Sequence, residues 1–374
     1  MGHSRSYSVA VAAVWALGLG AALAAPSDLP TVEDPRLHPM FQADRVWNGV
    51  TTTRDGRVFV GFPQADRPGV QVEELVNGRD PVPIPDAAWN AGAAGGDVSH
   101  AFVLINSLRI GPDGALWLVD AGAPGIGKPA VKGGARLFRI DLATNRIARV
   151  YDLGSVAAQD SFVDDVRFHG QTAYLTDAGS PGLIVLDLGS GQARRVLDHH
   201  PSTTDQRSMF ADGKLLVDKE GKEVRAHADQ LELSPDGTLL YFQPASGPMW
   251  RIATHWLDDP AIPADKLARQ VEPFADVPTT GGTAIDAHGT LYVADENRRR
   301  IITVTPDGAM ATLIADPRLV WTDAMWIDAD GFLWMPAAQL NLTPGMNGGR
   351  DEVHYPVAIY KMQIGVGPSP IDHP

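Results

Sequence analysis

The sequence contains no cysteine among its 374 residues. Disulfide bonds, zinc–thiolate sites and cysteine nucleophiles are therefore excluded, and the fold has to be stabilised by its apolar core alone. Aromatic residues make up only 7% of the chain, but hydrophobic residues reach 44%. A chain of this length and composition can form a large core without covalent cross-links.

Long hydrophobic runs are missing except near the N-terminus. There Arg5 precedes an apolar stretch from Val9 to Ala22, and the small residues Ala22 and Ala24 suit signal-peptide cleavage. The stretch is too short for a membrane anchor, and no stop-transfer pattern follows it. We expect residues 1–24 to be a signal peptide and residues 25–374 to form a single domain. The mature protein would be secreted or periplasmic, without membrane attachment.

Positive charge is scarce. Without Arg5, the mature chain has 30 basic against 45 acidic residues, a net charge of −15. An acidic surface repels phosphate backbones, so nucleic acid is not an expected partner. The expected partner is a small-molecule substrate or ligand, and the negative field would attract cations or amines.

Helical periodicity is nearly absent, and Asp258 to Ala268 is the only helix-like stretch. Instead, one phrase recurs: a polar residue, a short apolar alternation, a Gly-containing turn and a second β-rich run. In four copies the turn Asp lies seven residues after the starting residue. The six copies start at Asn48, Asn106, Asp164, Asp229, Gly282 and Asp323.

The repeated turns are hairpin signals, because Asp-Gly pairs suit turns with positive φ. The starting residues are 41 to 65 positions apart, which suits propeller blades of roughly 40–50 residues plus loops. We therefore predict an all-β fold, a six-bladed β-propeller with four-stranded blades. A β-sandwich does not predict one hairpin phrase repeated six times. The last copy shows only three clear strands, so an N-terminal segment around Met40 to Val46 should close the last blade.

Four long segments interrupt the repeat, and loops of this length are usually functional covers or binding loops. They span residues 86–100, 121–134, 199–228 and 340–356.

The starting residues of the six copies should surround the central axis, since the innermost strands of a propeller begin at one face. Their carboxylate and amide oxygens suit a hard cation, Ca²⁺ first and another divalent cation next. Alternatively, each Asn or Asp bonds to nearby backbone at its strand start. Gly282 breaks the ring and leaves one side open. The candidate metal ligands are Asn48, Asn106, Asp164, Asp229 and Asp323.

Crowded carboxylates raise one another's pKa and create a candidate general base. Asp229 and Asp164 are the candidate catalytic bases. His227 lies two residues before Asp229 and is a candidate proton shuttle or fourth metal ligand, with an exposed loop histidine as the alternative. Arg298, Arg299 and Arg300 are expected in an exposed turn of the fifth blade, with an anion site as the alternative.

Three stretches resemble the major royal jelly/yellow protein family. They run from Ile105 through Gly122, from Phe162 through Asp177, and from Leu233 through Thr254. This resemblance implies a secreted six-bladed propeller. Members of the family are linked to dopachrome conversion or bind small ligands in the channel.

A more distant similarity is to the SMP-30/gluconolactonase/luciferin-regenerating propellers, carried by Ala294 to Asn297 with Arg300-Ile301. It implies a divalent cation at the channel mouth, held by acid and amide residues at the inner-strand starts. Asn106, Asp164 and Asp229 match those positions. Asn48 stands where that group carries Glu.

Three functions remain open at this point. The favoured one is divalent-metal-dependent hydrolysis of a lactone-like small molecule, in which a cation polarises the carbonyl. The second is binding of an amine-type ligand without turnover. The third, dopachrome-type tautomerisation, follows from the family resemblance alone.

Overall fold

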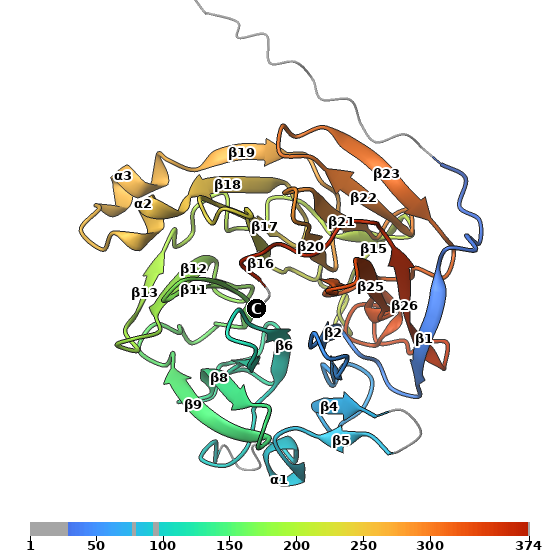
Figure 1. The fold of residues 1–374 in the computed structure, drawn as a ribbon, viewed down its shortest axis with the longest axis horizontal. Helices are drawn as coiled ribbons and strands as arrows, with labels where there is room; N and C mark the ends of the chain where they lie inside the picture. The colour runs from blue at the N-terminus through green and yellow to red at the C-terminus, as the bar shows by residue number, and fades with distance from the viewer. Residues whose placement is uncertain (1–28, 77–79, 93–96, 373–374) are drawn as a thin grey trace, which may run out of the picture.

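The computed structural model describes residues 29–76, 80–92 and 97–372, so the predicted signal peptide lies outside the described residues. Within those ranges the strands form six four-stranded antiparallel sheets and one two-stranded hairpin. The sheets are arranged around a central axis like blades (Figure 1). The predicted six-bladed propeller is confirmed.

The first three blades each follow chain order from the axis outward, with each strand paired to the next. Blade 1 consists of β2 (Gly49–Thr52), β3 (Val58–Gly61), β4 (Val72–Leu75) and β5 (Val82–Pro83). Blade 2 consists of β6 (Ile105–Ile110), β7 (Leu116–Ala121), β8 (Ala135–Asp141) and β9 (Arg146–Asp152). Blade 3 consists of β10 (Val163–His169), β11 (Thr172–Asp177), β12 (Gly182–Asp187) and β13 (Ala193–Val196).

The last three blades complete the ring. Blade 4 consists of β16 (Ala228–Leu233), β17 (Leu239–Pro244), β18 (Met249–Ala253) and β19 (Glu272–Ala275). Blade 5 consists of β20 (Thr283–Ile285), β21 (Leu291–Asp295), β22 (Arg300–Val304) and β23 (Met310–Ala315). Blade 6 consists of β24 (Trp326–Ile327), β25 (Phe332–Ala337), β26 (Val357–Gln363) and β1 (His38–Ala43).

The ring is closed by the N-terminal strand, as predicted. β1 pairs antiparallel with β26, from His38 opposite Lys361 to Ala43 opposite Val357, with one irregularity between Pro39 and Phe41. β1 is therefore the outermost strand of a blade whose other strands come from the C-terminal part of the chain. This pairing covers the edge of β26 that would otherwise be exposed.

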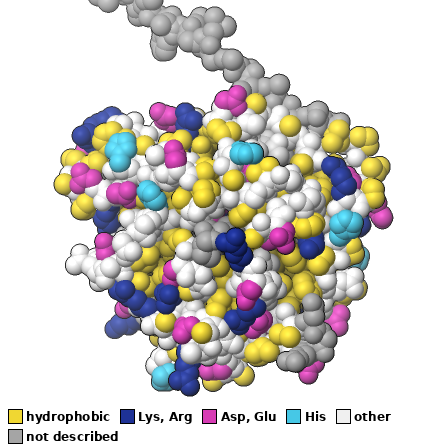
Figure 2. Space-filling view, in the orientation of Figure 1, with side chains coloured by type: hydrophobic (Ala, Val, Ile, Leu, Met, Phe, Trp, Pro, Cys, Tyr) yellow, Lys and Arg dark blue, Asp and Glu magenta, His cyan; other side chains and the backbone are white. Residues whose placement is uncertain are grey.

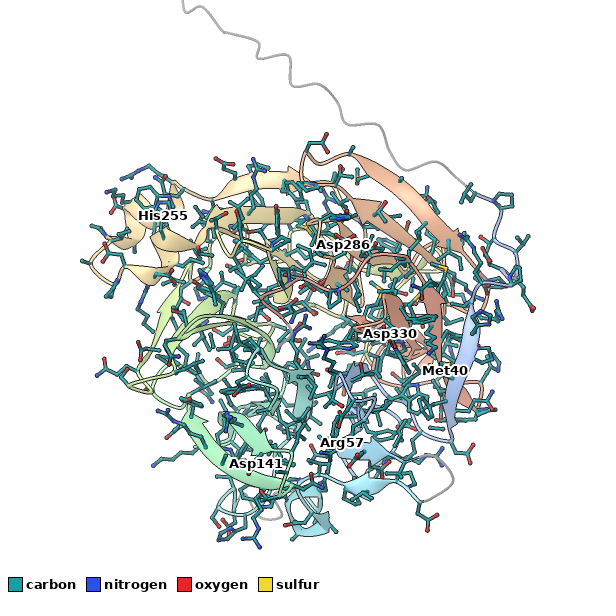
Figure 3. All side chains as sticks on the ribbon, in the orientation of Figure 1. Met40, Arg57, Asp141, His255, Asp286 and Asp330 are labelled. Carbon is teal, nitrogen blue, oxygen red and sulfur yellow. The ribbon has the colours of Figure 1, made fainter. Side chains whose placement is uncertain are left out.

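Buried apolar side chains fill the spaces between neighbouring blades. The second strands β3 and β7 are buried along their whole length, because blades cover both of their faces. Aromatic residues of second strands also bond back to the turn acids: Trp117 to Asp113 and Trp334 to Asp328, at 3.0 and 2.7 Å. Figure 3 shows the dense side-chain packing and places Met40 at the outer edge of the molecule.

Helices play a small part in the described ranges. α1 (Ala87–Asn90) precedes blade 2, and η2 (Leu340–Leu342) lies within blade 6. The predicted helix-like stretch from Asp258 to Ala268 contains one short helix, α3 (Ala264–Ala268), and a second helix that was not predicted, α2 (Thr254–Asp258), ends where the stretch begins. Pro260 and Pro263 separate them, because proline lacks the N–H that would continue a helix. No helix among the described residues is long and apolar enough to cross a membrane.

Charged side chains of both signs are interspersed over the face shown in Figure 2, with hydrophobic side chains between them. This face therefore has no extended patch of a single charge. The central part of the same face is where the C-terminal segment ends (Figure 1).

Candidate functional site

The six starting residues of the repeat meet at the central axis. Asn48, Asn106, Asp164, Asp229, Gly282 and Asp323 all line one narrow channel segment. All of them except Gly282 also line a larger cavity of about 560 Å³. The two amides and three carboxylates therefore form the floor of this cavity at one mouth of the channel.

Irregularities in the strand pairing direct three of these side chains toward the central axis. The pairing of the two inner strands shifts register between Ile105 and Ser107 in blade 2. The same occurs around Asp164 in blade 3 and around Asp229 in blade 4. A bulge takes its residue out of the regular ladder and redirects the side chain. Asn106, Asp164 and Asp229 occupy these bulges, which is why they face the axis.

The two amide side chains are oriented by hydrogen bonds that use their nitrogens. Asn48 Nδ2 donates to the Asn106 carbonyl oxygen at 2.9 Å, and Asn106 Nδ2 donates to Asp164 Oδ1 at 2.8 Å. Asn48 Oδ1 is buried and has no hydrogen-bond partner among the described residues. A buried acceptor without a partner costs about 1–3 kcal/mol, so this oxygen is suited to a ligand.

The other two floor carboxylates are held from blades 4 to 6. Gln230 Nε2 donates to Asp229 Oδ1 at 2.8 Å. Asp323 accepts from Trp321 Nε1 at 3.0 Å and from the Ala324 backbone N–H at 2.8 Å. Asp323 thus partly follows the alternative interpretation, in which a strand-start carboxylate bonds to nearby backbone.

The floor carboxyls resist ionisation. Burial, followed by repulsion from Asp229, raises the pKa of Asp164 well above its usual value. Burial and the Asp323 charge likewise raise the pKa of Asp229. Burial raises the pKa of Asp323 to about 7, against the effect of its two hydrogen bonds. The floor therefore favours a proton or a bound cation over three free negative charges.

Behind the floor, a buried ion-pair network fills the channel. Arg167 donates to Glu232 at 2.7 and 2.9 Å and to Asp165 at 2.7 Å. Arg109 contacts Asp372 of the C-terminal segment at 3.1 Å. Although burial acts in the opposite direction, Arg167 and Arg109 lower the pKa of Asp165. Asp165 is therefore a structural anion, unlike its neighbour Asp164.

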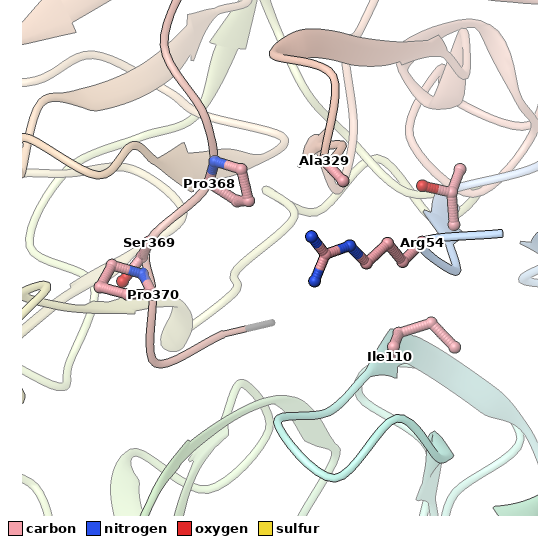
Figure 4. Close-up of a pocket in the computed structure, with 7 residues that line it drawn as sticks. Arg54, Ile110, Ala329, Pro368, Ser369 and Pro370 are labelled. Carbon is pink, nitrogen blue, oxygen red and sulfur yellow. The ribbon is translucent and has the colours of Figure 1, made fainter. Parts of the chain in front are cut away.

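A second cavity lies at the opposite end of the inner strands. It has a volume of about 370 Å³ and is lined by the C-terminal residues Pro368 to Pro370 together with Thr52, Arg54, Ile110 and Ala329. Figure 4 shows the Arg54 side chain extending toward these C-terminal residues. This cavity contains none of the predicted site residues.

His227 has a different place from the floor residues. Its Nδ1 lies 2.7 Å from Asp205 Oδ1, and His227 is not among the residues that line the cavity. Arg225 pairs with the same Asp205 carboxylate. The role of His227 as a proton shuttle or metal ligand therefore stays a prediction, since its imidazole pairs with Asp205 outside the cavity lining.

The cavity walls come largely from long segments between the strands. Ile126 belongs to segment 121–134, Met209 to segment 199–228, and Met346 to segment 340–356. The hairpin β14 (Phe210–Ala211) with β15 (Lys214–Leu215) lies within the second of these. None of the described residues of segment 86–100 lines this cavity. Three of the four predicted covering segments therefore contribute to the site.

One buried acid at the site was missed by the sequence reasoning. Glu296 is 3% exposed and accepts from the backbone N–H groups of Gly281 and Thr322, both at 3.2 Å. Burial and the nearby Asp323 raise its pKa well above the usual value. Glu296 connects the chain segments beside Asp323. The Ala294 to Asn297 motif contained it but did not show that its side chain turns inward.

The donor set allows only a mixed cation site. No group of three or more His, Cys, Asp or Glu side chains suited to a metal ion occurs among the described residues. A cation at the floor would therefore need amide oxygens as well as carboxylates. Asp164, Asp229 and the unpartnered Oδ1 of Asn48 line the same channel segment, and carboxylate and amide oxygens are the kinds of ligand that a hard cation takes.

Comparison with protein families gives one match. The family model of the major royal jelly proteins matches residues 106–366. This range includes the floor residues of blades 2 to 6. Comparison with curated proteins finds no match.

Solved structures with a similar fold include three enzymes. A gluconolactonase from Xanthomonas campestris has a TM-score of 0.54 and 14% identity over 87% of this chain and 88% of that chain. A luciferin-regenerating enzyme has a TM-score of 0.54 and 11% identity over 89% and 96%. A streptogramin B lyase has a TM-score of 0.51 and 13% identity over 87% and 96%. At these identities the similarity establishes the fold alone.

Proposed function

The chain belongs to the major royal jelly protein family, and from that premise we propose that it is an enzyme that hydrolyses a lactone-like ester at the cavity floor with the help of a divalent cation. The observation that carries this proposal is the convergence of two amides and three carboxylates from five blades. Such a cluster of groups with shifted pKa values, at the base of a cavity, is typical of catalytic sites.

A divalent cation would be held by Asp164, Asp229 and the Asn48 Oδ1 atom. When bound, it would polarise the carbonyl of the ester. Asn106 orients Asp164 through its side-chain N–H, and Gln230 orients Asp229. Contrary to the expectation from the sequence, glycine at position 282 does not leave this side of the ring open: a Cβ there would lie 2.5 to 2.8 Å from backbone atoms of Asp323 and Ala324, so glycine allows the two chain segments to pack closely.

Asp323 is the carboxylate that remains for proton transfer. Its raised pKa, about 7, lies near the value at which a general base and general acid work best at neutral pH. Asp323 would take a proton from the attacking water and return one to the leaving alkoxide. Its bonds to Trp321 and Ala324 fix the orientation of the carboxyl.

The test combines metal analysis with turnover. Purified protein should contain Ca²⁺ or another divalent cation, and a lactone screen should show hydrolysis that a chelator abolishes and added cation restores. Asp229→Asn should lower kcat/KM by at least 100-fold, whereas Asp276→Asn, an exposed residue in blade 4, should not. Turnover that is absent, or that survives complete removal of metal, would refute the cation-dependent mechanism.

A second function is favoured by the shortage of acid ligands. An ammonium group needs fewer and less regular oxygens than a metal ion, and the buried floor carboxyls offer an electrostatic partner for it. The protein would then bind an amine without turnover. Thermal shifts with a panel of primary amines, together with the absence of any product, would support this function over the first.

A further inference from the structure

The cavity wall between the floor and the rim is apolar. Its main side chains are Ile126, Phe162, Met209, Trp321, Leu340 and Met346. They come from blades 2, 3 and 6 and from the segment between blades 3 and 4. A ligand that reaches the floor therefore passes between carbon surfaces on several sides.

The wall is held in place by packing. Met209 and Trp321 are 1% and 4% exposed and belong to the largest cluster of buried hydrophobic residues, which also includes Leu340. Phe162 packs in a separate cluster with Ile126 against it. These contacts fix the wall before any ligand binds, so a ligand meets a preformed apolar surface.

Three polar groups in the buried part of the wall are already bonded inside the protein. Trp321 Nε1 donates to Asp323. Thr280 and Thr343 line the cavity, but their hydroxyls donate to the carbonyl oxygens of Pro278 and Leu340, at 2.9 and 2.7 Å. Charged donors also line the cavity, at Lys128, Lys219, Lys222 and Arg225, but these side chains are exposed. The buried part of the wall therefore offers few donors to a ligand.

This composition discriminates between two kinds of lactone. The hydroxyls of a sugar lactone would lose water at the wall without gaining partners, which disfavours binding. Burial of an alkyl or aryl substituent against the wall would instead stabilise the bound state, because apolar surface leaves water. We propose that the substrates are lactones with an alkyl or aryl substituent, selected by the apolar wall. This inference rests on the hydrolytic function proposed above.

A homologous series of substrates tests the selectivity. δ-Valerolactone, δ-octalactone and δ-decalactone differ only in alkyl length, and glucono-δ-lactone carries hydroxyls instead. We expect kcat/KM to increase roughly fourfold for each added methylene until the wall is covered. Glucono-δ-lactone should be the poorest of the four substrates. Equal values across the alkyl series, or a preference for glucono-δ-lactone, would overturn the inference.

A methionine pair supplies the matched variants. Met346→Gln keeps the length of a half-buried wall side chain but adds a polar amide. It should reduce the ratio of kcat/KM for δ-decalactone over δ-valerolactone by about tenfold. Met40→Gln makes the same change on β1 at the outer edge of the molecule (Figure 3) and should leave the ratio unchanged. An unchanged ratio in a folded Met346→Gln protein would contradict a selective wall.

Direct binding separates this inference from the proposed reaction. The probes are δ-valerolactam and its 6-pentyl derivative, which resist hydrolysis, measured by calorimetry. Tighter binding of the pentyl lactam without hydrolysis of any lactone would refute the proposed reaction and support selection by the apolar wall. Lactone hydrolysis together with equal affinities for the two lactams would support the proposed reaction and overturn the inference that the wall is selective. Neither hydrolysis nor lactam binding would overturn both.

Discussion

At the scale of residues, the site depends on where a few side chains lie relative to the strand ladder. The sequence identified Asn48, Asn106, Asp164, Asp229 and Asp323 by their repeat phase, and the structure brings them to one cavity floor. It did not identify Glu296 or the pairing of His227 with Asp205. Repeat phase predicts which positions are equivalent, but the direction of a loop side chain depends on contacts that are distant in sequence.

The buried carboxyls predict an unusual pH dependence of stability. Because the pKa of Asp323 is about 7, the folded protein keeps a proton that the unfolded chain releases near pH 4. In metal-free protein, the free energy of unfolding should therefore fall as pH rises from about 4 to about 7, by up to about 4 kcal/mol from this group. Urea unfolding at several pH values measures it.

The matched variant for this prediction is Asp323→Asn, which cannot ionise. Between pH 4 and 7 its free energy of unfolding should decrease less than that of the parent protein, by the part that Asp323 contributes. This holds whatever the absolute stability of the variant. Asp164 and Asp229 have pKa shifts of the same sign, so a smaller slope should remain. If the variant and the parent protein show equal slopes, Asp323 is already ionised in the folded state.

At the scale of elements, three blades share a buried ion pair at the end of the second strand. Asp120, Asp177 and Asp295 each pair at 2.7 Å with an arginine farther out in the same blade. The arginine is on the third strand in blades 2 and 5 and on the fourth strand in blade 3. Asp177 also accepts backbone N–H groups of Phe162 and Ser180 at 2.9 Å. These acids therefore fix the loops next to the bulges that carry Asn106 and Asp164.

Removal of one of these acids should strongly destabilise the folded protein. Asp177→Ala leaves the Arg195 guanidinium without its main buried partner and should lower the free energy of unfolding by about 3–5 kcal/mol. Asp276→Ala, which breaks the exposed pair with Arg207, should change it by less than about 1 kcal/mol. Denaturant unfolding of both variants compares them. Similar decreases in the free energy of unfolding would show that burial of the Asp177–Arg195 pair has little effect on stability.

At the scale of the whole molecule, the ring could be predicted from the sequence because its repeat is long and regular. Six hairpin phrases and a missing strand in the last copy were enough to predict closure by an N-terminal segment, which the β1–β26 pairing confirms. The ion-pair network around Arg167 could not be predicted. Its members come from blades 2, 3 and 4 and from the C-terminal segment, and only closure of the ring brings them together.

Closure by β1 should dominate global stability. A chain that begins at Asp44 lacks β1 and exposes the edge of β26, so it should unfold at a much lower temperature and aggregate. A chain that begins at Leu29 retains the strand and serves as the control. Scanning calorimetry and size-exclusion chromatography measure the two effects. Equal transition temperatures would mean that blade 6 is stable with three strands.

Blade 6 is built from segments more than 300 positions apart, since His38 lies opposite Lys361. During synthesis, the first strand must wait until nearly the whole polypeptide has left the ribosome before its partner exists. The five earlier blades can assemble in the meantime, but the circle stays open. The N-terminal strand therefore stays without its partner until the last blade has been synthesised.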